Sequence, residues 1–564
     1  MTQVAPELLA LQRLYHWEKT APERVALTQP MGGGAVQDFT WGQIGDQVRH
    51  MAAHLQSQGW EPGSRVAILS KNCAWWMMSD LAIWMAGHVS VPLYPTLAAE
   101  TVRQILTHSE AKACFIGKLD GWEGMKPGVP AGMPCISYPL SPPDAIQAYD
   151  GWDAICGRNQ PLQGEPLRQA DDLATLIYTS GTTGMPKGVM HSFGNFAWAL
   201  DSGLKRIPMS GEDRMLSYLP LAHVVERMLV EHGWLRTGMH VFFAESLDTF
   251  AADLQRARPT IFFSVPRLWV KFQQGVHHKM PPAKLDRLLR IPILGGIVRK
   301  KVMKALGLDQ CHFAAGGAAP MPVALLQWYS RLGLHINEGY GMTENLALSH
   351  ITEPGKNQQG TVGPTYAGVQ HRIDPATGEV QMHSQALMQG YYKEPEKSRE
   401  CFTDDGWLKT GDKGSIDTQG LLRITGRVKD LFKTGKGKYV APAPIEDKLV
   451  MHEAVEACVV TGANLGQPLG IVMLNADAVA RVAADAAART ELEASLAAHL
   501  KGINATLDPH EQLQCIVVVT TAWTVDNDII TPTFKVKRNR IEDLYARHYE
   551  AWEASGRKVI WMEG

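Results

Sequence analysis

Short apolar segments alternate with longer amphipathic segments through the first three quarters of the chain, and few folds are compatible with this alternation. Arg65 to Ser70 is typical of a buried strand, a helical segment runs on to Ala86, and Val89 to Tyr94 is typical of a second strand. A chain that passes repeatedly from strand to helix and back builds a sheet covered by helices. The sequence therefore predicts a layered α/β architecture.

The pattern changes near Thr425. A hairpin is predicted over Gly414 to Thr425, with a turn at Asp417 to Gly420, and the basic run Arg427 to Asp430 follows it. At 564 residues the chain also exceeds the size at which a single core keeps growing. We therefore predict two domains, residues 1–427 and residues 428–564.

The second predicted domain contains a short helix opening near Pro444 and a longer Ala-rich helix around Val479 to Leu500. Strands are predicted at Val455 to Thr461, Ile471 to Asn475 and Cys515 to Thr520. These elements suffice for a small α+β domain.

Composition argues against several classes of protein. The 55 Lys and Arg residues oppose 57 Asp and Glu residues, and a formal net charge of -2 gives no general attraction to nucleic acid. The 8 cysteines include no CxxC pair, which disfavours a zinc knuckle or a redox motif and fits a reducing cytoplasm.

Met1 to Gln12 has neither the basic start nor the apolar run of a signal peptide. Trp75 to Leu93 is interrupted by Asp80 and His88, so we expect a buried helix and strand there rather than a membrane span.

The most informative segment is Tyr178 to Gly188, which reads YTSGTTGMPKG and follows a predicted strand at Leu173 to Tyr178. Its glycines let backbone N–H groups approach phosphate oxygens, its hydroxyls donate further hydrogen bonds, and Lys187 supplies a compact positive charge. The spacing of Gly181 and Lys187 differs from that of the common P-loop. The segment is therefore predicted to hold a polyphosphate at a strand end, before a helix that begins near Ser192.

This segment resembles the signature loop of the adenylate-forming superfamily, which includes acyl-CoA synthetases, firefly-type luciferases and the adenylation domains of nonribosomal peptide synthetases. The resemblance extends in the expected order from Phe39-Thr40-Trp41 and Gly63 to Ala67 through the C-terminal lysine region. It implies an α/β fold with a large N-terminal layered domain and a small, mobile α+β C-terminal domain.

The resemblance assigns the nucleotide site residue by residue. Ala315 to Pro320 looks like the segment that flanks adenine, and Asn337 to Glu344 looks like the motif in which the tyrosine stacks on adenine, the threonine contacts the α-phosphate and the glutamate binds Mg²⁺. These roles suit an aromatic face and a hard-cation carboxylate. The implied nucleotide-binding residues in these three motifs are Thr179, Ser180, Gly181, Thr182, Thr183, Gly184, Lys187, Gly317, Ala318, Ala319, Glu338, Gly339, Tyr340, Gly341 and Thr343, and the implied metal ligand is Glu344.

Three further motifs follow in the second half of the chain. Trp407 to Asp412 is similar to the ribose motif, which implies that Asp412 accepts both sugar hydroxyls, and Gly426 to Lys433 is similar to the interdomain linker. By this match Arg427 contacts the ribose, Lys429 is the hinge and Lys433 approaches the site during thioester formation. Ile530 to Arg538 resembles the final motif, whose lysine reaches the site during adenylation; we assign that role to Lys535, with Lys537 as the alternative.

The expected chemistry follows from these parts. A carboxylate barely reacts with a thiol until it becomes a mixed anhydride with AMP, so ATP must activate it first. The attacking carboxylate and the α-phosphate are both anionic, and the main tasks are charge neutralisation and alignment. The sequence thus predicts an AMP-forming acid–thiol ligase that uses ATP, Mg²⁺ and coenzyme A, with Lys535, Thr343, Lys433 and His223 as its catalytic residues.

A medium- to long-chain fatty acid is the predicted substrate. Leu219 to Arg227 and Val265 to Trp269 look like the versions found in long-chain acyl-CoA synthetases, and the match places His223 near the acyl and thiol sites. Some long-chain relatives carry a gating tryptophan just after this histidine, where this chain has Glu226 and Arg227. Acyl length therefore stays open, and Trp234 and Trp269 are assigned to core packing rather than to an acyl tunnel.

Several alternatives stay open from sequence alone. Acyl carrier protein in place of coenzyme A, an aryl or other acid, and a luciferase-like oxygenase would all share the adenylation residues. A nonribosomal peptide module is expected to carry a phosphopantetheine serine in a following carrier domain, and the sequence to Gly564 holds none. From another class, the chain could be a non-catalytic nucleotide or acyl-ligand binder. We expect a cytoplasmic protein that does not bind nucleic acid, with peripheral attachment to the inner face of the membrane and a homodimer both left open.

Overall fold

The computed structural model describes residues 4–562 except 180–184, 357, 526 and 532–534. The chain divides into two compact units. Unit 1 comprises Met1–Ala319, Leu325–His371 and Met382–Leu408, and unit 2 comprises Pro320–Ala324, Arg372–Gln381 and Lys409–Gly564. The predicted boundary between residues 427 and 428 stays a prediction.

Unit 1 is built on an eight-stranded sheet in the order β18-β9-β8-β4-β3-β5-β6-β7. Strands β8, β4, β3, β5, β6 and β7 run parallel, whereas β9 pairs antiparallel with β8 and with β18. The bounds are β3 Arg65–Leu69, β4 Val89–Leu93, β5 Ala113–Ile116, β6 Cys135–Ser137, β7 Asp150–Gly151, β8 Leu173–Thr179, β9 Lys187–Ser192 and β18 Gly390–Tyr391.

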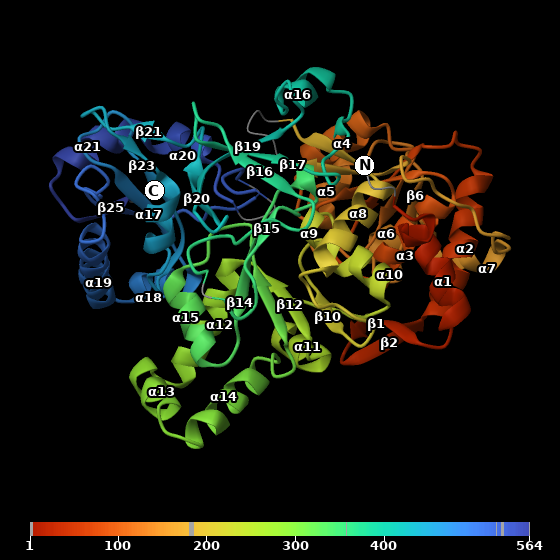
Figure 1. Ribbon diagram of the computed structural model, residues 1–564, viewed down its shortest axis with the longest axis horizontal. Helices are drawn as coiled ribbons and strands as arrows, with labels where there is room; N and C mark the ends of the chain where they lie inside the picture. The colour runs from red at the N-terminus through yellow and green to blue at the C-terminus, as the bar shows by residue number, and fades with distance from the viewer. Residues whose placement is uncertain (1–3, 180–184, 357, 526, 532–534, 563–564) are drawn as a thin grey trace. The chain divides into compact units, whose positions relative to one another are not determined.

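Two four-stranded sheets complete unit 1 (Figure 1). The first has the order β10-β11-β1-β2 and the second β12-β13-β14-β15, in which β12, β13 and β14 are parallel. Their bounds are β1 Val25–Gly32, β2 Ala35–Thr40, β10 Arg214–Ser217, β11 His240–Phe243, β12 Ile261–Ser264, β13 Phe313–Gly316, β14 Ile336–Tyr340 and β15 His350–Ile351.

Helices alternate with these strands along the chain. They are α1 Ala10–Thr20, α2 Trp41–Ser57, α3 Ala74–Met85, α4 Ala99–Ser109, α5 Trp122–Met125, α6 Pro143–Ala148, α7 Trp152–Arg158, α8 Phe193–Leu204, α9 Val224–Glu226, α10 Gly233–Thr237, α11 Phe250–Ala257, α12 Pro266–Lys279, α13 Pro282–Leu289, α14 Leu294–Ala305, α15 Val323–Arg331 and α16 Pro395–Glu400, with a π-helix at Arg227–His232 between α9 and α10. Every residue of α3 is buried, so the prediction of a buried helix followed by a strand in Trp75 to Leu93 is confirmed. Among the described residues no helix is both long enough and apolar enough to cross a membrane.

Unit 2 has its own core. Strands β23 Val455–Thr461, β24 Leu469–Leu474, β25 Ile516–Val519 and β26 Val559–Met562 form one sheet, and α17 Pro442–Leu449, α18 Ala476–Ala484, α19 Ala486–Asn504, α20 Arg538–Tyr545 and α21 Tyr549–Ala554 accompany it. Two apolar clusters, one around Val472 and Leu496 and one around Val517 and Trp552, lie within this part of the chain. The α+β composition predicted for the C-terminal part is confirmed.

A smaller sheet, β16-β17-β19-β20, carries the predicted hairpin. Its strands are β16 Gln370–Ile373, β17 Glu379–His383, β19 Leu408–Ile416 and β20 Leu422–Arg427, and a two-stranded ribbon follows at β21 Phe432–Lys433 and β22 Tyr439–Val440. The carboxylate of Asp417 accepts from the backbone N–H groups of Gln419 and Leu421, each at 2.9 Å, which stabilises the predicted turn.

Two details differ from the sequence-based expectation. The segment after β8 leads into strand β9 before the helix predicted near Ser192, and Ser192 then caps that helix, α8, by accepting from the N–H of Asn195. The single helix predicted around Val479 to Leu500 is two helices, because Asp485 ends α18 and its side chain caps α19.

Candidate active site

The signature segment forms the connection between strands β8 and β9. Residues 180–184, and with them the predicted phosphate contacts of Ser180, Gly181, Thr182, Thr183 and Gly184, lie outside the described residues. The two ends of the segment are paired, with Thr179 opposite Lys187 in the antiparallel register. The hairpin therefore fixes where the segment starts and where Lys187 stands.

Lys187 and Glu344, predicted from motifs 157 positions apart, meet through Tyr391. The ammonium of Lys187 lies 4.8 Å from the centroid of the Tyr391 ring, within cation–π range. The hydroxyl of Tyr391 donates a hydrogen bond of 2.8 Å to Oε1 of Glu344. The buried Tyr391 side chain thus contacts both the predicted phosphate-binding cation and the predicted metal-binding carboxylate. The sequence motifs did not identify Tyr391.

Burial of Tyr391 raises the pKa of its phenol, and the neighbouring Glu344 carboxylate raises it further. The phenol therefore keeps its proton and acts as a donor to Glu344. A single carboxylate is enough for a Mg²⁺ ion that is bound mainly by the substrate's phosphates, because this ion takes few protein ligands in phosphate-transfer sites. No cluster of three or more His, Cys, Asp or Glu side chains suited to a metal occurs among the residues that the structure describes.

The short turn Thr343–Asn345 that carries Glu344 is held from two sides of unit 1. The Nε2–H of His191, on β9, donates to the carbonyl oxygen of Thr343 at 2.7 Å, and the backbone N–H of Met388 donates to the carbonyl oxygen of Glu344 at 2.8 Å. Burial lowers the pKa of His191 to about 4, so the ring is neutral at pH 7 and its proton lies on Nε2. These contacts position Thr343 and Glu344 relative to Lys187.

The segments predicted to flank adenine lie side by side at the carboxyl ends of β13 and β14. The register pairs Gly316 with Glu338, and a Cβ on Gly317 would come within 3.0 Å of the Gly339 carbonyl oxygen. Ligands in α/β proteins bind at the carboxyl ends of parallel strands. Ala318 and Ala319 follow the buried strand and are exposed, so their backbone is available to a ligand.

The motif around Tyr340 is shaped by a close backbone approach. A Cβ on Gly341 would lie 2.3 Å from the carbonyl carbon of Ala347, so only glycine fits there. Tyr340 stands opposite His350 in the register of β14 and β15, with ring centroids 6.1 Å apart. Glu338 is buried, and its backbone N–H donates to the hydroxyl of Thr352 at 2.8 Å.

The predicted ribose residues form an ion pair in unit 2. Asp412 and Arg427 are register partners on β19 and β20, and Nε of Arg427 lies 3.1 Å from Oδ1 of Asp412. Gly411 has a φ of 73° and bends strand β19. The Glu379 carboxylate stabilises this bend by accepting a hydrogen bond of 2.8 Å from the Gly411 N–H. The structure thus brings together the two residues that the resemblance assigns to the sugar.

The linker after Arg427 is exposed at Lys429 and is tied down just beyond it. Asp430 lies 3.3 Å from Nε of Arg538, and the same guanidinium donates to both oxygens of Glu446 at 2.6 Å. Lys433 lies on β21 with its ammonium 4.9 Å from the Tyr439 ring. A rigid anchor therefore follows directly on the predicted hinge.

The final motif distinguishes its two lysines. Lys537 donates to Asp528 and its backbone N–H bonds the carbonyl oxygen of Ile529, so it is part of the local structure. Lys535 is exposed, and its backbone carbonyl oxygen accepts from the N–H of Thr531 at 2.8 Å. The assignment of the adenylation role to Lys535, with Lys537 as the alternative, stays a prediction.

His223 caps helix α9. Its Nδ1 accepts from the backbone N–H of Val225 at 3.2 Å. The next residues turn inward: Oε1 of Glu226 accepts from the Ser217 hydroxyl at 2.8 Å, and Arg227 is fully buried against Asp80. Burial raises the pKa of Glu226 to about 8. Glu226 and Arg227 thus belong to the interior of unit 1.

The packing roles expected for two tryptophans agree with the structure. Trp234 stacks on Trp41 with centroids 4.3 Å apart, and Trp269 packs edge-on against Tyr329 and Phe262; both indoles are fully buried.

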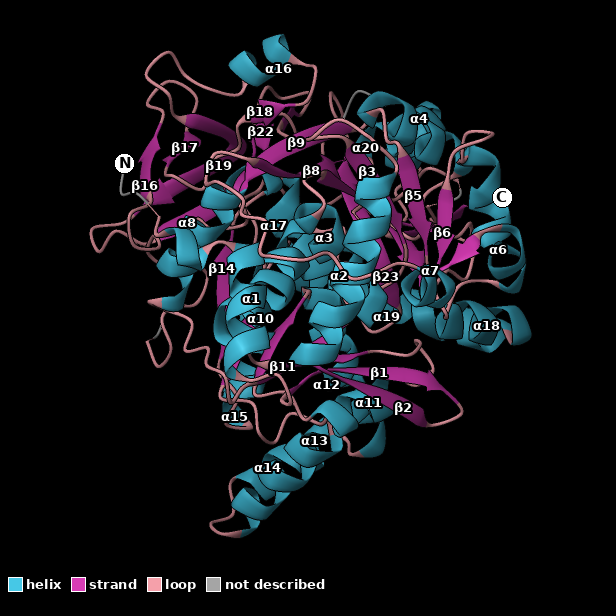
Figure 2. Cartoon of the chain, turned by 90° about the vertical axis from the view of Figure 1, so that its right-hand side faces the viewer, coloured by secondary structure: helices cyan, strands magenta, loops and turns pink. Residues whose placement is uncertain are grey.

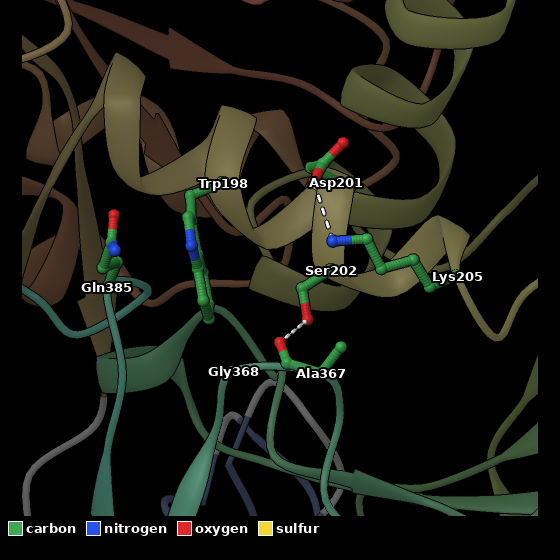
Figure 3. A pocket seen from close by; sticks show the side chains of 7 residues that line it. All are labelled: Trp198, Asp201, Ser202, Lys205, Ala367, Gly368 and Gln385. Atoms are coloured by element: carbon green, nitrogen blue, oxygen red, sulfur yellow. Dashed lines mark hydrogen bonds and ion pairs between the residues drawn. The ribbon is translucent and has the colours of Figure 1, made fainter. Parts of the chain in front are cut away.

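A surface hollow of ≈ 350 Å³ lies apart from these motifs in the sequence. It is lined by Trp198, Asp201, Ser202, Lys205, Ala367, Gly368 and Gln385 (Figure 3). Inside it Lys205 pairs with Asp201 at 3.1 Å and the Ser202 hydroxyl donates to the Ala367 carbonyl oxygen at 2.6 Å. None of its lining residues is a predicted site residue.

Comparisons with known proteins give matches over nearly the whole chain. A family model described as AMP-binding enzyme matches residues 14–392, and one described as AMP-binding enzyme C-terminal domain matches residues 429–554. The chain is 30% identical over 580 residues to the long-chain-fatty-acid CoA ligase FadD15 of Mycobacterium bovis, covering 95% of this chain and 96% of the relative. It is 28% identical to the peroxisomal long chain acyl-CoA synthetase 6 of Arabidopsis thaliana, covering 91% of this chain and 81% of the relative. Among solved structures, the adenylation domain of a carboxylate reductase from Mycobacterium chelonae superposes with a TM-score of 0.80 at 22% identity, covering 98% of this chain and 92% of that chain.

Proposed function

Because this chain belongs to the family of AMP-binding enzymes, we propose that it is an AMP-forming acyl-CoA synthetase that activates a medium- to long-chain fatty acid with ATP and transfers the acyl group to coenzyme A. The observation that carries the proposal is that Tyr391 contacts both Lys187 and Glu344. These residues come from two distant motifs, have opposite charges, and suit the phosphates and the metal ion of a nucleoside triphosphate.

In the first step a carboxylate oxygen of the acid attacks the α-phosphorus of ATP and pyrophosphate leaves. Lys187 and the backbone of the signature segment neutralise the phosphates, Thr343 contacts the α-phosphate, and Lys535 stabilises the charge that develops there. Glu344 would hold Mg²⁺, which supplies positive charge to the phosphate oxygens. Tyr340, Gly317, Ala318 and Ala319 surround the adenine, and Asp412 with Arg427 binds the ribose.

In the second step the thiol of coenzyme A attacks the acyl carbon and AMP leaves. A thiol with an ordinary pKa of about 8.5 is already partly ionised near neutral pH, so no strong base is required. His223 and Lys433 are the residues that we assign to this step. Movement about Lys429 would exchange Lys535 for Lys433 between the two steps.

The identity of the acid substrate is the part of the proposal that depends most on the similarity to known relatives. The relatives named above are a long-chain-fatty-acid CoA ligase and a long chain acyl-CoA synthetase, and the match extends over nearly the whole chain. We extend this to a cytoplasmic enzyme acting on a fatty acid, attached peripherally to the inner face of the membrane and able to form a homodimer.

The test is exchange of labelled pyrophosphate into ATP with acids from acetate to oleate and with aromatic acids. We expect exchange that is strongest with medium- or long-chain fatty acids, is lost with a chelator and returns with Mg²⁺. Exchange strongest with an aromatic acid would replace the proposed substrate, and no exchange with any acid would contradict the adenylation itself. Coenzyme A and acyl carrier protein are then compared as acceptors of the bound adenylate.

A further inference from the structure

The helical hairpin made by α13 and α14 presents an apolar tip. Of the thirteen exposed large apolar side chains among the described residues, four fall within residues 291–297. Ile293 is 84% exposed and Ile297 58%, with Ile291 and Leu294 beside them. Scattered exposed apolar residues are ordinary on a protein surface, but a contiguous group marks a contact site.

The tip is not a displaced piece of core, because both helices already make their inward contacts with other residues. Leu285 is the buried side chain of α13, and α14 buries Gly295, Val302 and Met303. A Cβ on Gly295 would lie 2.6 Å from the Leu289 carbonyl oxygen, so the chain turns tightly from α13 into α14. In both views the pair extends away from strand β14 of the same unit, and in Figure 1 also from β12 (Figures 1 and 2).

Positive charge surrounds this tip. Between residues 279 and 304 there is a single carboxylate, Asp286, against eight exposed cations: Lys279, Lys284, Arg287, Arg290, Arg299, Lys300, Lys301 and Lys304. Asp286 is paired with Arg331 at 3.0 Å, outside the hairpin, and no ion pair within the described part of the chain engages any of the eight. The chain as a whole has a formal net charge of -2, so this concentration of cations is local.

We propose that the α13–α14 hairpin docks on an anionic phospholipid surface, with Ile291, Ile293, Leu294 and Ile297 inserted at the interface and the flanking lysines and arginines on the lipid headgroups. Clustered cations are attracted to anionic leaflets, and reversible membrane binding becomes stable when an apolar insertion and a basic patch act together. Nucleic acid would also attract the cations, but it offers nothing to four aliphatic side chains. The inference rests on the peripheral membrane attachment given under the proposed function, to which it assigns a surface, and it does not depend on the proposed catalytic activity.

The experiment uses flotation of the full chain with vesicles of pure phosphatidylcholine and with vesicles containing phosphatidylglycerol. We expect binding to the anionic vesicles, weakening as salt is raised because surface charges are screened. Lys300→Glu/Lys301→Glu and Ile293→Asn/Ile297→Asn should each weaken binding at least tenfold. Matched controls are Leu247→Asn, at a side chain 92% exposed outside the hairpin, and Arg481→Glu/Lys501→Glu, at exposed cations of α18 and α19; both should bind like the wild type.

Three outcomes would overturn the proposal. The wild type could fail to bind anionic vesicles, the hairpin variants could bind as the wild type does, or the Ile variants could change the oligomeric state and not vesicle binding, which would make the tip an interface between copies of this chain. Thermal unfolding of every variant excludes loss of fold. Pyrophosphate exchange on the same preparations separates the two proposals, since wild-type protein that binds vesicles without exchange would contradict only the adenylation.

Discussion

At the scale of single residues, the side chain that joins the candidate site is one that no motif singled out. Tyr391 lies on β18, at the edge of the large sheet, and reaches both Lys187 and Glu344. Groups that hydrogen-bond a metal-binding carboxylate orient it and tune its affinity. Tyr391 is therefore a positioning residue, and its ring and its hydroxyl act on different partners.

Substitution can separate these two actions. Tyr391→Phe keeps the ring beside Lys187 and removes the donor to Glu344, so the Mg²⁺ concentration for half-maximal pyrophosphate exchange should rise about tenfold. Tyr391→Leu also removes the ring, and the apparent KM for ATP should rise as well because Lys187 loses its support. Binding of Mn²⁺ with ATP, followed by electron paramagnetic resonance, reports on the metal without turnover.

The neighbouring Tyr392 is the matched control for Tyr391. It lies next in the chain, its hydroxyl is 3.4 Å from Glu110, and its ring is flanked by Arg65 and Lys393, so it has similar chemistry at the surface. Tyr392→Phe should leave the Mg²⁺ requirement unchanged. An equal effect of Tyr391→Phe and Tyr392→Phe would show that Glu344 does not need this donor.

The two lysines of the final motif allow a second prediction. Lys535→Ala should reduce pyrophosphate exchange by about two orders of magnitude, as expected for loss of one charge-stabilising group, and leave thioester formation from supplied acyl-adenylate nearly intact. Lys537→Ala removes a surface pair with Asp528 and should cost at most about 1 kcal/mol of stability, with exchange retained. Loss of both half-reactions in Lys535→Ala, or loss of exchange in Lys537→Ala, would count against the assignment.

The motif residues could be predicted from sequence, but the side chains that hold them in position could not. Lys187, Glu344 and Asp412 each stand in a local pattern with a recognisable task. Tyr391 and His191 have no such pattern, because their partners lie far away in the sequence: Thr343 and Lys187 are more than 150 positions from them, and Glu344 is 47 positions from Tyr391. A Gly-Tyr-Tyr stretch or a lone His reads as packing until the strands around it are known.

At the scale of elements, strand β9 does two tasks that were not expected of it. It places Lys187 at one end and His191 near the other, and His191 holds the turn that carries Glu344. The strand is stabilised by its pairing with β8 and β18, which is a long-range effect that local propensity does not report. The Ala-rich helix was predicted as one element because the capping role of Asp485 depends on a change of direction rather than on composition.

The His191 contact predicts a pH dependence of stability. The pKa of His191 is about 4 in the folded chain, because of burial, against an ordinary value of 6.5, so the unfolded chain binds a proton that the folded chain does not. The stabilisation is therefore complete above about pH 6.5 and is lost as the pH falls toward 4, by about 3 kcal/mol in total.

His191→Gln keeps an amide donor for the Thr343 carbonyl oxygen and does not titrate. Denaturant unfolding of the wild type and of this variant between pH 7 and pH 4 should converge as the pH falls, because the wild type alone loses this contribution. His240 serves as a comparison for a buried histidine elsewhere in the structure. Burial also lowers its pKa to about 4, but its ring bonds Thr28 and not the turn at Thr343. A constant difference between wild type and His191→Gln across the range would contradict a neutral, buried His191.

At the scale of the whole molecule, the open question is where the C-terminal domain begins. The compact units divide between Leu408 and Lys409, whereas the C-terminal family model begins at residue 429 and the predicted hinge is Lys429. The two apolar clusters of the C-terminal part use residues from Phe432 onward, and the anchor of Asp430 on Arg538 lies at its start. The hairpin of β19 and β20 instead completes a sheet with β16 and β17.

Residues 428–564 should therefore fold alone, because a segment of this size with its own apolar clusters can bury enough surface. We expect one cooperative unfolding transition by circular dichroism in denaturant. Residues 409–564 should be no more stable and more prone to associate, since β19 would lose its neighbour β17 and expose an unpaired edge. If instead only the longer fragment unfolded cooperatively, the hairpin would belong to the C-terminal folding unit, and a hinge at Lys429 would have to bend within a domain rather than between two.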